Sequence, residues 1–236
     1  MTIRRQPSYR SHAVAALEQR QLLSGNVTAI PVKVAGITDI VVTGDSSSNS
    51  IKIVQSGMQE YTVSGTSGTK INGNLGGSFK FNFSNFNDVL ISMNSGDDSV
   101  VLVGGTADFD SNLVIDTGAG TDLVNLGGVT VKGRLTVQMG DDKDKLDMLN
   151  STIASALAIG MDAGEDLANL VGVTVKGTLT VQMGTGTNKL NIKNSRLHNS
   201  GTVADAGVKS SFNFFNNQGN VNYTRGVILT RLNILF

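Results

Sequence analysis

The sequence predicts an all-β fold, a parallel β-solenoid with coils of about 22 residues. The first observation behind this prediction is a repeat in the middle of the chain. The clearest lines share a spacing of 22 residues and begin at Leu113, Leu135, Leu157 and Leu179. A looser line, two residues longer, begins at Val89. The segment VTVKGRLTVQMG at 129–140 recurs as VTVKGTLTVQMG at 173–184, which indicates that a two-coil unit was duplicated.

The second observation is the alternation of apolar and polar residues inside each line. In LTVQM, Leu135, Val137 and Met139 face one way, while the residues between them face the other. Runs of four or five residues between Gly and Asp turns are strands, because they are too short for helices. Stacking places equivalent residues about 4.8 Å apart, so the aliphatic columns form a continuous core. An antiparallel β-sandwich or meander shares this alternation and is the structural alternative, but the fixed period favours the solenoid.

Composition excludes several functional classes. Cys is absent, so there are no disulfides, thiolate metal sites or cysteine nucleophiles. The 19 basic residues balance 19 acidic ones, which argues against nucleic acid as a partner. The chain has no run of 18 apolar residues, so the sequence predicts no transmembrane segment.

The chain divides into four predicted parts. Residues 1–30 are a basic leader that we expect to be disordered or removed. Residues 31–88 form degenerate first coils or an N-terminal cap, and residues 89–200 form the regular coils. Residues 201–236 are rich in Phe, and we expect them to cap the open end of the solenoid.

The leader carries LEQRQLL at Leu17–Leu23, followed by Ser24 and Gly25. This segment resembles the LEPR-XLL motif near the N-terminus of many large exported or surface proteins of planctomycetes and related bacteria. Gln19 stands where that family has Pro. The resemblance implies an extracellular or cell-surface location and says nothing about chemistry.

Acidic residues recur in one turn of the predicted coil. The turns SGDDS, GAGTD, GDDKD and DAGED resemble those of the RTX calcium-binding repeats, although RTX coils are shorter and carry two such turns each. If calcium binds, the expected ligands are carboxylates stacked in this turn, namely Asp98, Asp122, Asp142, Asp144, Asp162 and Asp166. The alternative is that Asp and Gly are simply good turn formers and that the carboxylates are solvated. The turn GTGTN, which ends at Asn188, has lost its acid.

No catalytic or cofactor-binding residue is predicted. His12 and His198 have no partner at ligand spacing, and Lys132 and Lys176 lie in a different turn from the acids. A further polar column is expected to brace the solenoid and contains Asn125, Asp147, Asn169 and Asn191.

These observations favour a non-enzymatic extracellular or cell-surface protein with a structural or adhesive role. Its expected partner is a surface polymer or protein, and its solenoid ends are expected to permit self-association. The first alternative is a calcium-binding RTX-like extracellular module. The second is a polysaccharide-acting β-helix enzyme, whose site would need carboxylates and a base converging in one groove.

Overall fold

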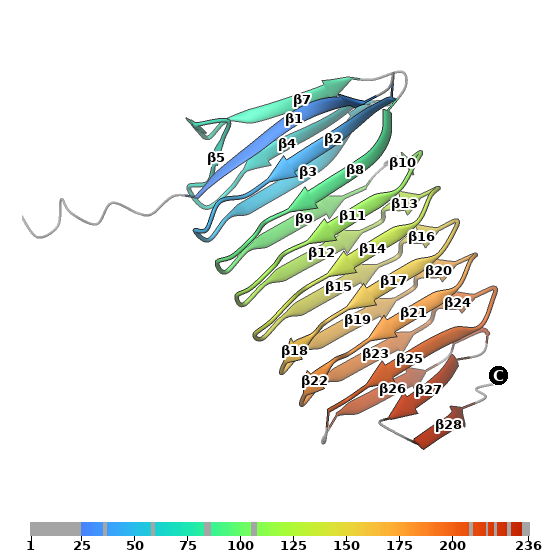
Figure 1. Ribbon diagram of the computed structural model, residues 1–236. Coiled ribbons are helices and arrows are strands. Elements are labelled where there is room, and N and C mark those ends of the chain that lie inside the picture. Colours follow the sequence, from blue (N-terminus) through green and yellow to red (C-terminus); the bar gives the residue numbers. More distant parts are fainter. Residues whose placement is uncertain are drawn as a thin grey trace, which may run out of the picture.

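The computed structural model describes residues 25–232, with gaps at 35–36, 58–59, 83–85, 105–107, 208–209, 216, 220 and 226–227. The LEPR-XLL-like segment Leu17–Leu23 and His12 lie outside the described residues. Within the described ranges every regular element is a strand, and most strands pair in parallel with the next coil. The predicted parallel β-solenoid is therefore confirmed (Figure 1). The described residues contain no helix that could span a membrane.

The described strands form four sheets, and the two largest run along the solenoid. The order of the 12-stranded sheet is β28 (Ile228–Leu232), β27 (Val221–Arg225), β25 (Gly201–Asp205), β21 (Leu179–Gln182), β17 (Leu157–Gly160), β14 (Leu135–Gln138), β11 (Leu113–Asp116), β8 (Phe86–Ser92), β2 (Ile37–Thr43), β1 (Asn26–Val34), β5 (Lys70–Ile71) and β6 (Asn74–Leu75). The order of the 9-stranded sheet is β26 (Ser211–Phe215), β23 (Lys189–Lys193), β19 (Leu167–Val171), β15 (Lys145–Leu149), β12 (Leu123–Gly127), β9 (Ser99–Val103), β3 (Ser50–Gly57), β4 (Glu60–Gly65) and β7 (Ser78–Asn82).

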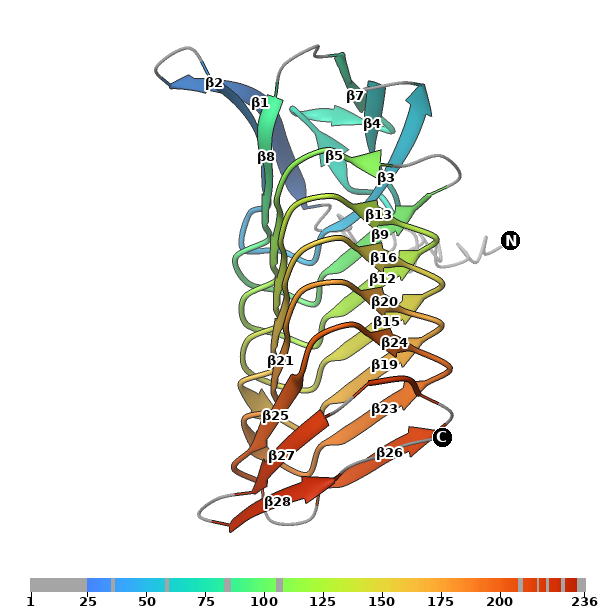
Figure 2. The same cartoon turned by 90° about the vertical axis from the view of Figure 1, so that its right-hand side faces the viewer.

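Two smaller sheets are built of short strands at the corners of the coils. A 5-stranded sheet contains β10 (Asp108–Phe109), β13 (Thr130–Val131), β16 (Thr152–Ile153), β20 (Thr174–Val175) and β24 (Arg196–Leu197). A 2-stranded sheet contains β18 (Ala163–Gly164) and β22 (Thr185–Gly186). Figure 2 shows β13, β16, β20 and β24 stacked above one another along the molecule.

The register between coils follows the sequence repeat. Leu135 of β14 pairs with Leu113 on one side and with Leu157 on the other, so each residue lies over its equivalent. Val124 in β12 likewise pairs with Leu146 in β15. All five of these side chains are at most 1% exposed. The predicted aliphatic columns therefore form one continuous core inside the coils.

The turn between β14 and β15 needs glycine. Gly140 has φ of +95°, a conformation that L side chains rarely adopt. A Cβ added to Gly140 would also collide with the backbone carbonyl of Gly118 in the coil before it. Stacked turns therefore restrict the residue type at this position through both backbone conformation and close approach.

Antiparallel strands lie at both ends of the stack. At the N-terminal end, β1 pairs antiparallel with β2, and β3, β4 and β7 form an antiparallel meander. At the C-terminal end, β27 and β28 form an antiparallel hairpin. Figure 1 shows β7 at one end of the molecule and β28 at the other.

Candidate functional site

The predicted acidic column is an interior ladder. Asp98, Asp122, Asp144, Asp166 and Asn188 each lie immediately before a strand of the 9-stranded sheet, and each is at most 2% exposed. The Oδ1 atom of each accepts a hydrogen bond from the backbone N–H of the equivalent residue in the coil before. The N···Oδ1 distances are 2.6 Å for Asn49 to Asp98, 2.7 Å for Asp98 to Asp122, 2.8 Å for Asp122 to Asp144, 3.0 Å for Asp144 to Asp166 and 3.1 Å for Asp166 to Asn188. The expectation of solvated carboxylates is therefore wrong for this column, because each side chain is buried and faces the coil before it.

The second carboxylate oxygen of each ladder aspartate is buried, and among the described residues it has no hydrogen-bond partner. In Asn188 the Nδ2 atom takes the place of this second oxygen. It donates to the backbone carbonyl of Met183, five residues earlier in the same coil, at 2.7 Å. Met139 and Met161 precede Asp144 and Asp166 by the same interval. A protonated Oδ2 can make this bond, whereas an ionised one accepts only. The repeat therefore favours neutral carboxylic acids inside the ladder.

The pKa values of the ladder agree with this interpretation. Burial raises the pKa of Asp98 to about 7, that of Asp144 to about 8 and that of Asp166 to about 6. Burial also raises the pKa of Asp122. For Asp144, the N–H of Asp122 opposes the increase, while the neighbouring charges of Asp122, Asp166 and Asp142 add to it.

The first turn of the solenoid holds an aspartate, Asp45, whose pKa is lowered and not raised. Asp45 accepts hydrogen bonds from the N–H groups of Asn26 and Ser47 and from Nδ2 of Asn49, at 2.8, 3.0 and 3.1 Å. Burial raises the pKa of Asp45, but these hydrogen bonds together lower it by more, so the net change in the pKa is downward. Asp45 thus orders the turn that presents the N–H of Asn49 to Asp98. Sequence reasoning missed this role, although the spacing GDSSSN indicates such a turn.

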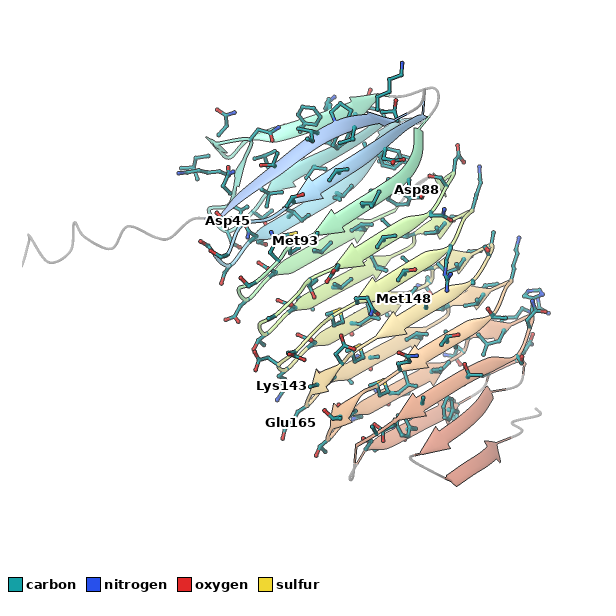
Figure 3. The ribbon with its side chains drawn as sticks, in the orientation of Figure 1. Asp45, Asp88, Met93, Lys143, Met148 and Glu165 are labelled. Atoms are coloured by element: carbon teal, nitrogen blue, oxygen red, sulfur yellow. The ribbon has the colours of Figure 1, made fainter. Side chains whose placement is uncertain are left out.

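The structure separates the six predicted calcium ligands into two sets. Asp98, Asp122, Asp144 and Asp166 lie inside, whereas Asp142 and Asp162 are exposed in turns. Figure 3 shows Lys143 and Glu165 projecting outward from this same edge of the solenoid. Within the described ranges, no three His, Asp or Glu side chains gather where they could hold one ion. Calcium requires six to eight oxygen ligands, so its binding here stays a prediction.

A second ladder runs over the outer face of the 9-stranded sheet. Nδ2 of Asn169 donates to Oδ1 of Asp147 at 2.7 Å, and Nδ2 of Asn191 donates to Oδ1 of Asn169 at 2.6 Å. Nδ2 of Asn213 then donates to Oδ1 of Asn191 at 2.7 Å. The predicted polar column is thus hydrogen-bonded between coils at Asp147, Asn169 and Asn191, and its bracing role stays a prediction. Asn213 was missed, although SFNFF follows KLNIK at the repeat spacing.

Comparison of the chain with protein-family models, with curated proteins and with solved structures found no match. The fold places the chain in the class of parallel β-solenoid proteins. Because many unrelated functions share one fold, the function has to be argued from the surfaces and ladders themselves.

Proposed function

We propose that this chain is a non-enzymatic structural or adhesive protein of the cell surface or extracellular space. The observation that carries the proposal is the outer Asn ladder, which repeats one side-chain arrangement on successive coils. A face that repeats at the spacing of stacked strands, about 4.8 Å, suits an extended polymer or protein partner more than a small substrate. The LEPR-XLL-like leader supports the location outside the cell.

The hollow at the corner of the last coils favours the same proposal over an enzyme. This pocket has a volume of about 290 Å³ and is lined by Asn194, Ser195, Arg196 and Gln218. None of these is a carboxylate, whereas glycoside hydrolysis requires a pair of them. A binding or scaffolding role needs no such pair.

Fractionation tests the location. Antibody detection in intact cells, in the culture medium and in the cytosol should find the protein outside the cytosol. A matched chain with Leu22→Asp and Leu23→Asp, which alters the leader and leaves residues 25–236 unchanged, should accumulate inside. Detection of the unaltered protein in the cytosol alone would refute the proposal.

Co-sedimentation with isolated cell envelopes tests the adhesive role. Asn169→Lys interrupts the outer ladder on the 9-stranded sheet, and Thr180→Lys places the same charge on the outer face of the 12-stranded sheet. We expect Asn169→Lys to weaken envelope binding and Thr180→Lys to leave it unchanged. If neither variant changes the binding, the Asn ladder does not carry adhesion.

A further inference from the structure

The two ends of the 9-stranded sheet have complementary edges. β26 is its last strand at the C-terminal end and β7 its last strand at the N-terminal end, so in this sheet each has one neighbour among the described strands. Figure 1 shows these strands at opposite ends of the molecule. An unpaired edge presents backbone N–H and C=O groups that can extend the sheet into another chain.

The two edge strands run in the same direction. β26 is parallel to β23 and, through the stacked coils, to β9 and β3. β4 is antiparallel to β3, and β7 is antiparallel to β4, so β7 is parallel to β26. A second copy that presents its β7 to β26 in the same orientation would therefore pair with it in parallel, which is the arrangement between successive coils.

We propose that this protein assembles head to tail with further copies of itself, through pairing of β26 in one copy with β7 in the next. The inference deepens the proposed structural role and rests on it. The partner is thus a second copy of this chain, and repeated addition produces a filament because the contact is heterologous.

The inward side chains of the two strands match in register. β26 reads SFNFF and β7 reads SFKFN. In β26, Phe212 and Phe214 lie over the buried Leu190 and Ile192, and in β7 Phe79 lies opposite the buried Val63. Among the described residues, these three Phe are the partly buried apolar side chains packed against the core, and they lie at its two ends. Alignment of the two SFxF segments would bring these end residues together and cover them.

The outward side chains also match. Each ladder residue accepts a hydrogen bond through Oδ1 from the next coil, and within the described residues this series ends at Asn213. The same register places Lys80 of the second copy beside Asn213. The Lys80 side chain is 66% exposed, and its Nζ lies 3.2 Å from Oε1 of Glu60, which leaves further ammonium protons for the Asn213 Oδ1.

Exposed apolar side chains mark the same two ends. Among the described large apolar residues, the two most exposed are Leu75 in β6, at 70%, and Phe215 in β26, at 66%. Leu75 lies on the last strand of the 12-stranded sheet at the N-terminal end. Exposed apolar groups at both ends of the molecule are typical of surfaces that another chain covers.

Sedimentation velocity of the purified full chain tests the interface. Between about 1 and 100 μM, we expect the mean sedimentation coefficient of the unaltered protein to rise with concentration. Asn213→Lys places a cation opposite Lys80 and should weaken association about tenfold or more. Asn125→Lys adds the same charge to the same outer column in the middle of the solenoid, and it should associate as the unaltered chain does.

A charge reversal supplies the positive control. The double change Glu60→Lys with Lys80→Glu keeps the pair within β4 and β7 but reverses its sign. Combined with Asn213→Lys, it should restore association to within about twofold of the unaltered protein. Thermal melts of every variant check that the fold is retained.

The outcomes separate this inference from the proposed function. An unaltered chain that stays monomeric over the whole range overturns the interface, and so does an Asn213→Lys chain that associates normally. Equal loss with Asn125→Lys also overturns it, because charge alone would then explain the effect. A cytosolic location refutes the surface role and leaves the interface standing.

Discussion

Replacing Asp144 by asparagine should make the protein less sensitive to rising pH. Oδ1 of Asp144 accepts the N–H of Asp122 at 2.8 Å, and an amide oxygen can accept the same bond. The ladder already holds an asparagine at Asn188, whose Nδ2 donates to the Met183 carbonyl at 2.7 Å. The Asp144→Asn change therefore keeps the hydrogen bonds of a neutral acid and removes the group that can ionise.

The magnitude follows from the pKa of Asp144, which burial raises from 3.8 to about 8. Between these values the folded chain holds a proton that the unfolded chain has released. Stability from this group is thus complete below the unfolded pKa and is lost as the pH rises towards 8. The loss is about 1.4 kcal/mol per pH unit, or about 3 kcal/mol between pH 5 and pH 7. The variant avoids this loss.

Differential scanning calorimetry at pH 5, 6 and 7 measures the effect. For a chain of this length, about 3 kcal/mol corresponds to a change in Tm of roughly 6–12 °C. The Tm of Asp144→Asn minus that of the unaltered protein should increase by this amount from pH 5 to pH 7. Asp142→Asn removes an exposed carboxylate from the same turn and serves as the matched control.

A difference in Tm that stays constant across this pH range would refute the reasoning, because Asp144 would then have the same charge in the folded and unfolded chains. A control variant that reproduces the whole pH effect would refute it as well. In that case the charge of the turn, and not the buried acid, would determine the pH dependence.

Three further predictions concern the turns and the core. Gly140→Ala should cost about 3 kcal/mol or more, because its Cβ meets the Gly118 carbonyl at a positive φ; Gly127→Ala, which meets nothing within 4 Å, should leave the Tm nearly unchanged. Ser151→Ala should cost about 1–3 kcal/mol in urea unfolding, because the buried N–H of Val129 then loses the Oγ acceptor 3.2 Å away. If the acidic turns bind calcium, 1 mM Ca²⁺ (a concentration on the order of an extracellular module's Kd) should raise the Tm and excess chelator should reverse the rise; equal melting curves would refute the calcium prediction.

The repeat could be predicted from the sequence because stacking places equivalent residues of successive coils in contact. Leu135 lies over Leu113 and under Leu157 because any other register would break the aliphatic column. The outer Asn column was predictable for the same reason, since an amide above an amide can bridge two coils. The period, the inward columns and the outer ladder therefore follow from local spacing alone.

The burial of the acidic column could not be predicted from the sequence. Asp is common both in solvated turns and in buried hydrogen-bonded turns, and its letter is the same in both. Asp144 is buried, and its side chain faces the preceding coil, where the N–H of Asp122 donates to it. The sequence feature that indicated burial was Asn188, because a neutral residue in the same column favours a ladder of uncharged side chains.

The sequence by itself determined the coil length, the inward side chains and the parallel stacking of the middle of the chain, because these depend on a short repeat that each coil satisfies with its neighbours. Only the tertiary structure decided the ends. Alternation of Phe and polar residues is equally compatible with parallel and antiparallel pairing, so SFKFN in β7 could be placed only once β4 had reversed beside β3. That reversal brings β7 to the edge opposite β26, in the same direction, from more than a hundred residues away.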